Sequence, residues 1–253
     1  MSAKRLKYII ALGLLLLPLL CSGQIAVFTK KQRIADFSAK TTKIVLTGEE
    51  TFDLCLRGEI ASRWRISPYE FCSRAEYENS KTSSKYYFLH CEKDKGGLLE
   101  MVLTRGGGKG GSSNLDSRMD VVSVPVNIRY MSIIIDIIQN YVEDATVSEA
   151  KGILGLKSYN GNLRKVKRKK LYYASREDEY FTDSLISNSA PCLVAFSITP
   201  EKPSQKAKVA LFIASADTHE LYYYKKRKFL IEADRNFSEK EQRELEREHG
   251  NSL

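Results

Sequence analysis

The sequence is poor in the residue patterns from which most catalytic and metal centres are built. It has three histidines in 253 residues, and it lacks the patterns Cys-x-x-Cys, Gly-x-Ser-x-Gly and His-Glu-x-x-His. These absences exclude the usual zinc ribbon, dithiol redox site, serine-hydrolase elbow and zinc-protease helix. We therefore expect no metal and no cofactor, and we favour a protein without catalytic activity over an enzyme.

None of the three histidines stands in a pattern typical of a catalytic site. His90 is next to Cys91 on an expected strand, so their side chains should point to opposite faces of the sheet. His219 follows Asp217 in an expected turn, where a metal could bind, although turn chemistry accounts for the aspartate. His249 falls in a terminal segment that we expect to fray.

Long apolar runs are also missing, apart from residues 8–20 near the N-terminus. This run follows a basic segment and precedes small residues, and these are the three parts of a secretory signal. Its length is about 13 residues, whereas a membrane-spanning helix needs roughly 20. We therefore predict that residues 1–23 are a signal peptide of bacterial type and that the protein is exported, either to the periplasm or to the medium.

Two routes could process this signal. Cleavage between Gly23 and Gln24 would place small side chains at the two positions that signal peptidase reads. The alternative is lipidation of Cys21, which would anchor the protein to a membrane. Lipoprotein signals usually carry a small residue before the cysteine, and here that residue is Leu20. We favour the soluble product and keep the anchored one as the alternative.

Cysteine is scarce in the rest of the chain. The cysteines that remain after the signal are Cys55, Cys72, Cys91 and Cys192. An even number in an oxidising compartment permits two disulfides. A chain of this length does not need disulfides to fold, however, and isolated cysteines are often buried as apolar residues. Bridged and free thiols therefore both stay open.

Acidic residues are fewer than basic ones, and the chain carries a formal net charge of +9. In an exported protein this excess points away from nucleic acid and toward an anionic membrane surface or an anionic envelope polymer. The densest cluster of charge is the basic run, residues 164–170. Its residues that could contact an anionic surface are Arg164, Lys165, Lys167, Arg168, Lys169 and Lys170. A second cluster of tyrosines and basic residues, 222–228, is typical of an edge strand guarded by lysines.

Residues 43–103 alternate between strand and helix patterns. Strands are expected at 43–46, 65–72, 85–92 and 98–103, with helices that begin near Thr47 and Ser73. Phe52, Leu56, Ile60 and Trp64 recur every four residues and should form one apolar face of the first helix. We expect Thr47 and Glu50 to form the capping box of that helix.

The second half begins with a strand pattern at 121–126 and a helix pattern at 130–142 that is apolar on most sides, as in buried helices. Further strands are expected at 171–174, 192–199, 208–215 and 221–230, the last three as an antiparallel meander. The sequence thus predicts the α/β class, with a mixed sheet that has a parallel βαβαβ first half and an antiparallel C-terminal meander.

The predicted domain organisation is simple. Residues 24–235 should form one α/β domain, and the polar stretch at 145–170 would be the junction if that domain has two lobes. Residues 236–253 should be a solvated C-terminal helix or tail, because Leu245 is nearly its only apolar helical residue.

The glycine loop, residues 106–113, is the segment most similar to a phosphate-binding loop. Lys109 is followed by Gly110 rather than by the required hydroxyl residue, and no helix pattern follows at once. We therefore predict a flexible surface loop. The leading hypothesis is an exported envelope protein that acts as a non-catalytic binding or assembly module. The alternative is a secreted enzyme or small-ligand-binding protein with its site at the carboxyl ends of the parallel strands, near Thr47, Gly48 and Ser73.

Overall fold

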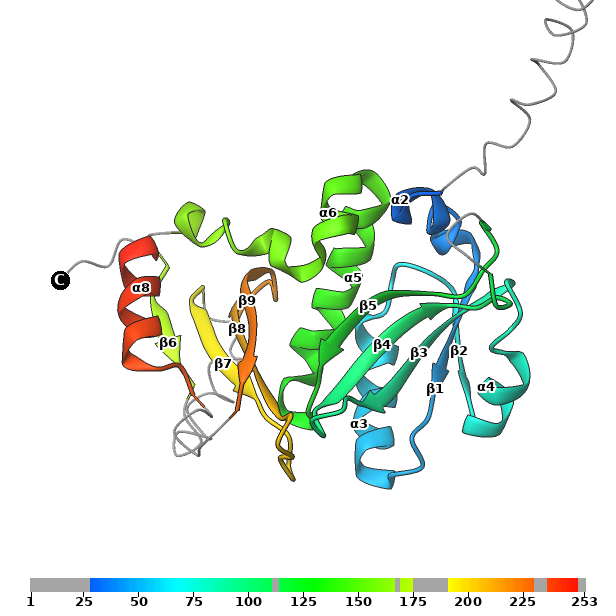
Figure 1. Ribbon diagram of the computed structural model, residues 1–253, viewed down its shortest axis with the longest axis horizontal. Coiled ribbons are helices and arrows are strands. Elements are labelled where there is room, and N and C mark those ends of the chain that lie inside the picture. The colour runs from blue at the N-terminus through cyan, green and yellow to red at the C-terminus, as the bar shows by residue number, and fades with distance from the viewer. Residues whose placement is uncertain (1–27, 111–113, 167–168, 175–190, 230–235, 250–253) are drawn as a thin grey trace, which may run out of the picture.

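The protein has an α/β fold in which two sheets lie on either side of one long helix, α5 (Met131–Val147) (Figure 1). The computed structural model describes residues 28–110, 114–166, 169–174, 191–229 and 236–249. The predicted α/β class, the parallel first half and the antiparallel C-terminal meander are confirmed. The meander, however, belongs to a second sheet and does not extend the first one.

The first sheet has the strand order β2-β1-β3-β4-β5. Its strands are β1 (Thr41–Val45), β2 (Tyr69–Cys72), β3 (Tyr86–Lys93), β4 (Leu99–Arg105) and β5 (Met119–Pro125). The central strand β1 pairs in parallel with β2 and β3, whereas β3, β4 and β5 pair antiparallel. The parallel half therefore consists of the two strand–helix–strand units that the sequence predicts.

Helix α3 (Glu50–Arg63) joins β1 to β2, and its predicted apolar face is buried. The predicted capping box of this helix is wrong. The carboxylate of Glu49 accepts hydrogen bonds from the first backbone amides of the helix, and Thr47 instead binds Asp53. An acidic cap serves as well as a hydroxyl here because the amino end of a helix favours negative charge.

Helix α4 (Arg74–Ser80) joins β2 to β3 and begins at Ser73, as predicted. The Ser73 hydroxyl accepts a bond from the backbone amide of Glu76, whose carboxylate in turn accepts from the backbone amide of Ser73. This reciprocal capping box explains why so short a helix starts at a defined residue.

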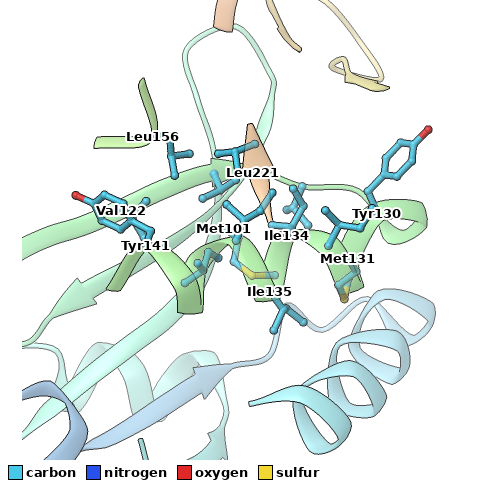
Figure 2. Packing of buried hydrophobic residues seen from close by; sticks show 14 of the residues in the cluster. Met101, Val122, Tyr130, Met131, Ile134, Ile135, Tyr141, Leu156 and Leu221 are labelled. Carbon is cyan, nitrogen blue, oxygen red and sulfur yellow. The ribbon is translucent and has the colours of Figure 1, made fainter. Parts of the chain in front are cut away.

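The second sheet has the order β6-β7-β8-β9. Its strands are β6 (Leu171–Tyr173), β7 (Leu193–Ile198), β8 (Lys208–Ser215) and β9 (Leu221–Lys228). Both sheets turn an apolar face toward α5, so this helix is buried on most sides. Figure 2 shows Met101 and Val122 of the first sheet and Leu221 of the second in one cluster with the side chains of α5.

The C-terminal helix α8 (Glu239–His249) corrects the expectation of a solvated helix or tail. Leu245 is buried and packs with Phe237 against the face of the second sheet that is turned away from α5. The carboxylate of Glu241 accepts a hydrogen bond of 2.9 Å from Lys225 of β9. One apolar residue on the helix is enough to dock it on the sheet, because the ion pair of Glu241 and the ring of Phe237 add further contacts.

The helices α2 (Lys30–Arg33) and α6 (Glu149–Leu154) lie together at the upper edge in Figure 1, next to the end of α5. The short 3₁₀ turns η3 (Gly155–Tyr159) and η4 (Leu163–Val166) continue from α6 toward α8. In the described parts of the chain, no helix is long and apolar enough to span a membrane.

Candidate functional site

An open pocket of about 420 Å³ lies where the glycine loop leaves β4 and the chain returns into β5. Its lining residues are Gly108, Lys109, Gly110, Arg118, Met119 and Asp120. Two cationic side chains and one carboxylate therefore surround a space of the size that small ligands occupy in proteins.

Glycine is required at the base of this loop because backbone segments approach each other closely. A Cβ atom at Gly106 would lie 2.2 Å from the carbonyl oxygen of Ser83. A Cβ atom at Gly107 would lie 2.1 Å from the carbonyl oxygen of Asp116, and Gly107 has a φ of +157°. The first two glycines of the loop thus serve a tight chain path, whereas residues 111–113 of the predicted flexible loop lie outside the described residues.

A buried arginine lies directly behind the pocket. One terminal nitrogen of Arg33 donates to the carbonyl oxygen of Ser117 at 2.8 Å and to the hydroxyl of Ser117 at 2.7 Å. Burial and the neighbouring charge of Arg105 lower the pKa of Arg33. No carboxylate in the described part of the chain forms an ion pair with this guanidinium. Arg33 instead bonds to oxygen atoms of Ser117 and Arg118, and the two carboxylates that pair with Arg105, Asp36 and Asp116, balance the charge of the two arginines.

The neighbouring Arg105 is fully buried, but its charge is balanced. It donates to the carboxylate of Asp36 at 2.6 Å, to the hydroxyl of Tyr87 at 2.8 Å and to the carboxylate of Asp116 at 3.1 Å. Burial works against ionisation of Asp36, but hydrogen bonds from Arg105, Lys40 and Tyr87 outweigh it and hold the pKa of Asp36 at about 2. Arg105 therefore stabilises the loop and adds little field to the pocket.

Asp120, the carboxylate of the lining, is exposed and ends a hydrogen-bond chain that begins at the buried His90. It accepts a bond of 3.0 Å from the hydroxyl of Thr104, whose oxygen lies 3.2 Å from Nε2 of His90. Burial, together with the nearby charge of Arg118, lowers the pKa of His90 to about 4. His90 is therefore neutral near pH 7, with its proton on Nε2, and it supports the wall without touching the pocket.

At the carboxyl ends of the parallel strands, where the sequence placed the alternative ligand site, the hydrogen-bond donors bind other groups of the protein. The backbone amides of Thr47 and Gly48 both donate to the carboxylate of Asp53 at 2.8 Å. The hydroxyl and amide of Ser73 are engaged with Glu76 in the capping box. Since these groups already have partners within the chain, they do not form an open cradle for a ligand.

The cysteines expected either to pair or to stay free are free. Cys55, Cys72, Cys91 and Cys192 form no disulfide. Cys72 lies on the face of the first sheet that also carries His90, whereas Cys91 packs on the opposite face against α5, as the strand alternation predicted. Burial raises the pKa of all four thiols, that of Cys91 to about 12. Such thiols are poor nucleophiles.

The sequence did not reveal the partner of His219. Its Nδ1 lies 2.7 Å from the carboxylate of Asp136 in α5, and Arg63 donates to the same carboxylate at 3.0 Å. A carboxylate that orients a histidine in this way occurs in catalytic triads. No hydroxyl or thiol among the described residues completes such a triad through a hydrogen bond to His219. The cluster instead joins the β8–β9 turn to α5 and α3.

His249, which we expected in a frayed segment, is buried at the end of α8. This finding corrects the sequence prediction. The physical reason is the docking of α8 on the second sheet, which the sparse apolar pattern of that segment does not reveal.

The basic run is only partly available for contacts with a partner. Lys169 donates to the hydroxyl of Ser215 at 2.7 Å and pairs with the carboxylate of Asp217 at 3.1 Å, which corrects its assignment to an anionic-surface contact. Arg164, Lys165 and Lys170 are exposed. Lys167 and Arg168 lie outside the described residues. In the second cluster, Lys225 pairs with Glu241 and Lys226 with Glu100, so β9 is an edge strand whose lysines hold other elements.

The comparisons with known proteins add no functional information: the chain matches no family model, no curated protein and no solved structure. Within the described ranges, no group of three or more His, Cys, Asp or Glu side chains could hold a metal ion.

Proposed function

We propose that this chain is an exported envelope protein that acts without catalysis, as a binding module for a small anionic group. The pocket between residues 108–110 and 118–120 would hold that group. The observation that carries the proposal is an open pocket lined by the cationic side chains of Lys109 and Arg118 and by the backbone of the glycine loop.

The balance of charge around the pocket favours an anion. Lys109 and Arg118 contribute two positive charges to the lining, and Asp120 contributes one negative charge that already accepts a hydrogen bond from Thr104. Hydrogen bonds between cationic side chains and phosphate or carboxylate oxygens are about twice as strong as neutral ones. A phosphate group carried by an anionic envelope polymer fits this chemistry.

The test is a titration of the protein with inorganic phosphate, followed by calorimetry and by the chemical shifts of the glycine-loop amides. The variants K109Q and R118Q should each weaken binding by roughly tenfold, because each removes one charge-assisted hydrogen bond. The matched control is K208Q, since Lys208 is an exposed lysine at the start of β8, outside the pocket lining. Thermal unfolding of R118Q checks the fold, because Arg118 also donates to the hydroxyl of Tyr77.

The proposal fails if wild-type protein binds phosphate no better than chloride, or if K109Q and R118Q bind phosphate as tightly as K208Q does. Either result would remove the pocket from consideration, whatever the compartment of the protein.

Export is tested separately by the mass of the mature N-terminus. A chain that begins at Gln24 supports cleavage and a soluble product, and a lipid-modified Cys21 supports the anchored product. A mature chain that still begins at Met1 would overturn export and with it the envelope assignment.

The alternative function is a secreted enzyme or a ligand-binding protein with its site at the carboxyl ends of the parallel strands. It has less support, because Asp53 already binds the amides of Thr47 and Gly48. A small molecule whose binding shifts the amide resonances of Thr47 and Gly48, and not those of the glycine loop, would favour it.

A further inference from the structure

Three large apolar side chains are exposed together where α5 ends and α6 follows. Val147 is 71% exposed, Ile153 is 74% exposed and Leu154 is 59% exposed. Val147 is the last residue of α5, and Ile153 and Leu154 are the last two of the short helix α6 that follows; we call this part of the molecule the apolar corner. Single exposed apolar residues are common on protein surfaces, but a local group of three on consecutive elements marks a contact site more often.

The N-terminal part of the described chain packs against this same corner. Lys31 of α2 donates to the carbonyl oxygen of Val147 at 3.0 Å, and the side chain of Lys30 lies against Gly152 of α6. The described chain therefore begins next to the exposed apolar corner.

Cationic side chains continue along the same edge. After α6 the chain runs through η3 and η4 toward α8, as the lime-green segment in Figure 1 shows. Lys157, Arg164 and Lys165 on this segment are exposed. The exposed carboxylates near the apolar corner are Glu143 of α5 and Glu149 of α6, so the three exposed cations still outnumber them.

We propose that this edge docks on the surface of an anionic lipid bilayer. The side chains of Val147, Ile153 and Leu154 enter the boundary between headgroups and acyl chains, and those of Lys157, Arg164 and Lys165 contact the anionic headgroups. We refer to these six residues as the membrane face. Apolar insertion combined with basic contacts is the usual means by which peripheral proteins hold to such a surface.

Two other occupants of the apolar corner are conceivable, and the chain itself argues for the bilayer. A second copy of the chain would place the same cations opposite one another, which disfavours a symmetric contact through this edge. Residues 8–20 of the same molecule are removed from the mature protein by cleavage, and in the lipidated form they are also absent. The identity of the membrane rests on the proposed export, but the docking itself does not depend on the phosphate pocket.

The test is flotation of the full chain and of residues 24–253 with vesicles of equal parts phosphatidylglycerol and phosphatidylcholine, compared with vesicles of pure phosphatidylcholine. The shorter chain retains the folded part, because the buried residues of all three apolar clusters lie at or beyond Ile34. We expect both chains to bind the anionic vesicles more tightly than the neutral ones, and the binding to weaken with salt.

Two double variants of the shorter chain locate the contact. R164Q/K165Q should lower the affinity for anionic vesicles by about thirtyfold, since each basic residue near such a surface contributes about fivefold. I153S/L154S should lower it at least tenfold, roughly the loss expected for two partly inserted apolar side chains. All four residues are exposed, so the variants should fold, and circular dichroism verifies this.

The control variants make similar substitutions at exposed residues outside the membrane face. L54S alters an apolar side chain that is 72% exposed on α3, and K93Q/K95Q removes two exposed charges at the β3–β4 turn. Both should bind vesicles as the wild type does. The proposal is overturned if residues 24–253 show no preference for anionic vesicles, or if the membrane-face variants bind as the controls do. It is also overturned if I153S/L154S changes the oligomeric mass and leaves vesicle binding intact, because a second copy would then cover the corner.

Discussion

Replacement of Asp136 by asparagine should weaken the link between the two sheets. The carboxylate of Asp136 is nearly buried in α5 and accepts bonds from His219 at 2.7 Å, Arg63 at 3.0 Å and Gln139 at 3.1 Å. Asparagine keeps the shape and one acceptor oxygen but loses the charge. Both carboxylate oxygens accept from donors, so in either orientation the amide NH₂ would lie opposite a donor group.

The magnitude follows from the surroundings of the carboxylate. A hydrogen bond to a charged group contributes about 1.5–3 kcal/mol, and breaking a buried pair costs about 3–5 kcal/mol. Solvent screens part of this interaction, because the side chain of Arg63 is 35% exposed. We therefore expect D136N to lower the free energy of unfolding at pH 7 by about 2–3 kcal/mol.

The effect should depend on pH in a defined direction. Burial alone would raise the pKa of Asp136, but the hydrogen bond and charge of His219, followed by the charges of Arg63 and Arg65, hold it below its usual value of 3.8. A carboxyl whose pKa is lower in the folded state stabilises the fold above its unfolded pKa and loses this contribution as the pH falls through the folded value. The difference between wild type and D136N should therefore be largest near pH 7 and shrink below about pH 4.

The measurement is urea unfolding at pH 7 and at pH 3, followed by circular dichroism and by the fluorescence of Trp64, the single tryptophan of the chain. The control is E78Q. Glu78 forms a solvent-exposed ion pair with Lys81, so its replacement should leave the free energy of unfolding unchanged. A loss for D136N of less than about 0.5 kcal/mol at pH 7 would refute the argument. The same conclusion follows if the difference is equal at both pH values.

Three further outcomes follow from the packing. The pKa of His90 is about 4 in the fold against 6.5 for the free side chain, so the unfolded chain takes up the proton first as the pH falls. Wild-type stability should then drop by about 3 kcal/mol between pH 6.5 and 4, and H90Q should flatten this slope in urea unfolding. L245A should lower the free energy of unfolding by about 2–4 kcal/mol, and an unchanged melting temperature would mean that α8 does not dock. G107A should cost at least about 2 kcal/mol in thermal unfolding because its Cβ would collide with Asp116, whereas G161A, with no atom in reach, should melt like the wild type.

Local structure was predictable from the residues because it depends on neighbours in the chain. The four-residue spacing of Phe52, Leu56, Ile60 and Trp64 predicted the buried face of α3, and all four side chains are buried. The start of α4 at Ser73 was also predictable, because the two hydrogen bonds that fix it join residues only three positions apart. Strand alternation also placed His90 and Cys91 on opposite faces of the sheet.

The pocket was less accessible to this reasoning. The glycine content of residues 106–113 marks the loop in the sequence, but a phosphate-loop motif includes only residues that are neighbours in the chain. The charge behind the pocket comes from Arg33, which reaches Ser117 across 84 positions. A cation on α2 has no local signal that connects it to a loop between β4 and β5.

The sequence by itself determined the strands and the helices α3, α4 and α5 in their order, because periodicity is a property of short segments, but it did not reveal α2, α6 or the buried face of α8. Only the tertiary structure decided which buried faces meet. The apolar character of a face does not specify which other face it packs against. The tertiary structure therefore decided that the last strands form a second sheet across α5 and that α8 docks on that sheet with one leucine. It also decided that Asp136 contacts His219, which is 83 positions away. The glycine pocket and the membrane face likewise bring together residues of separate segments, and they exist only after those segments have packed.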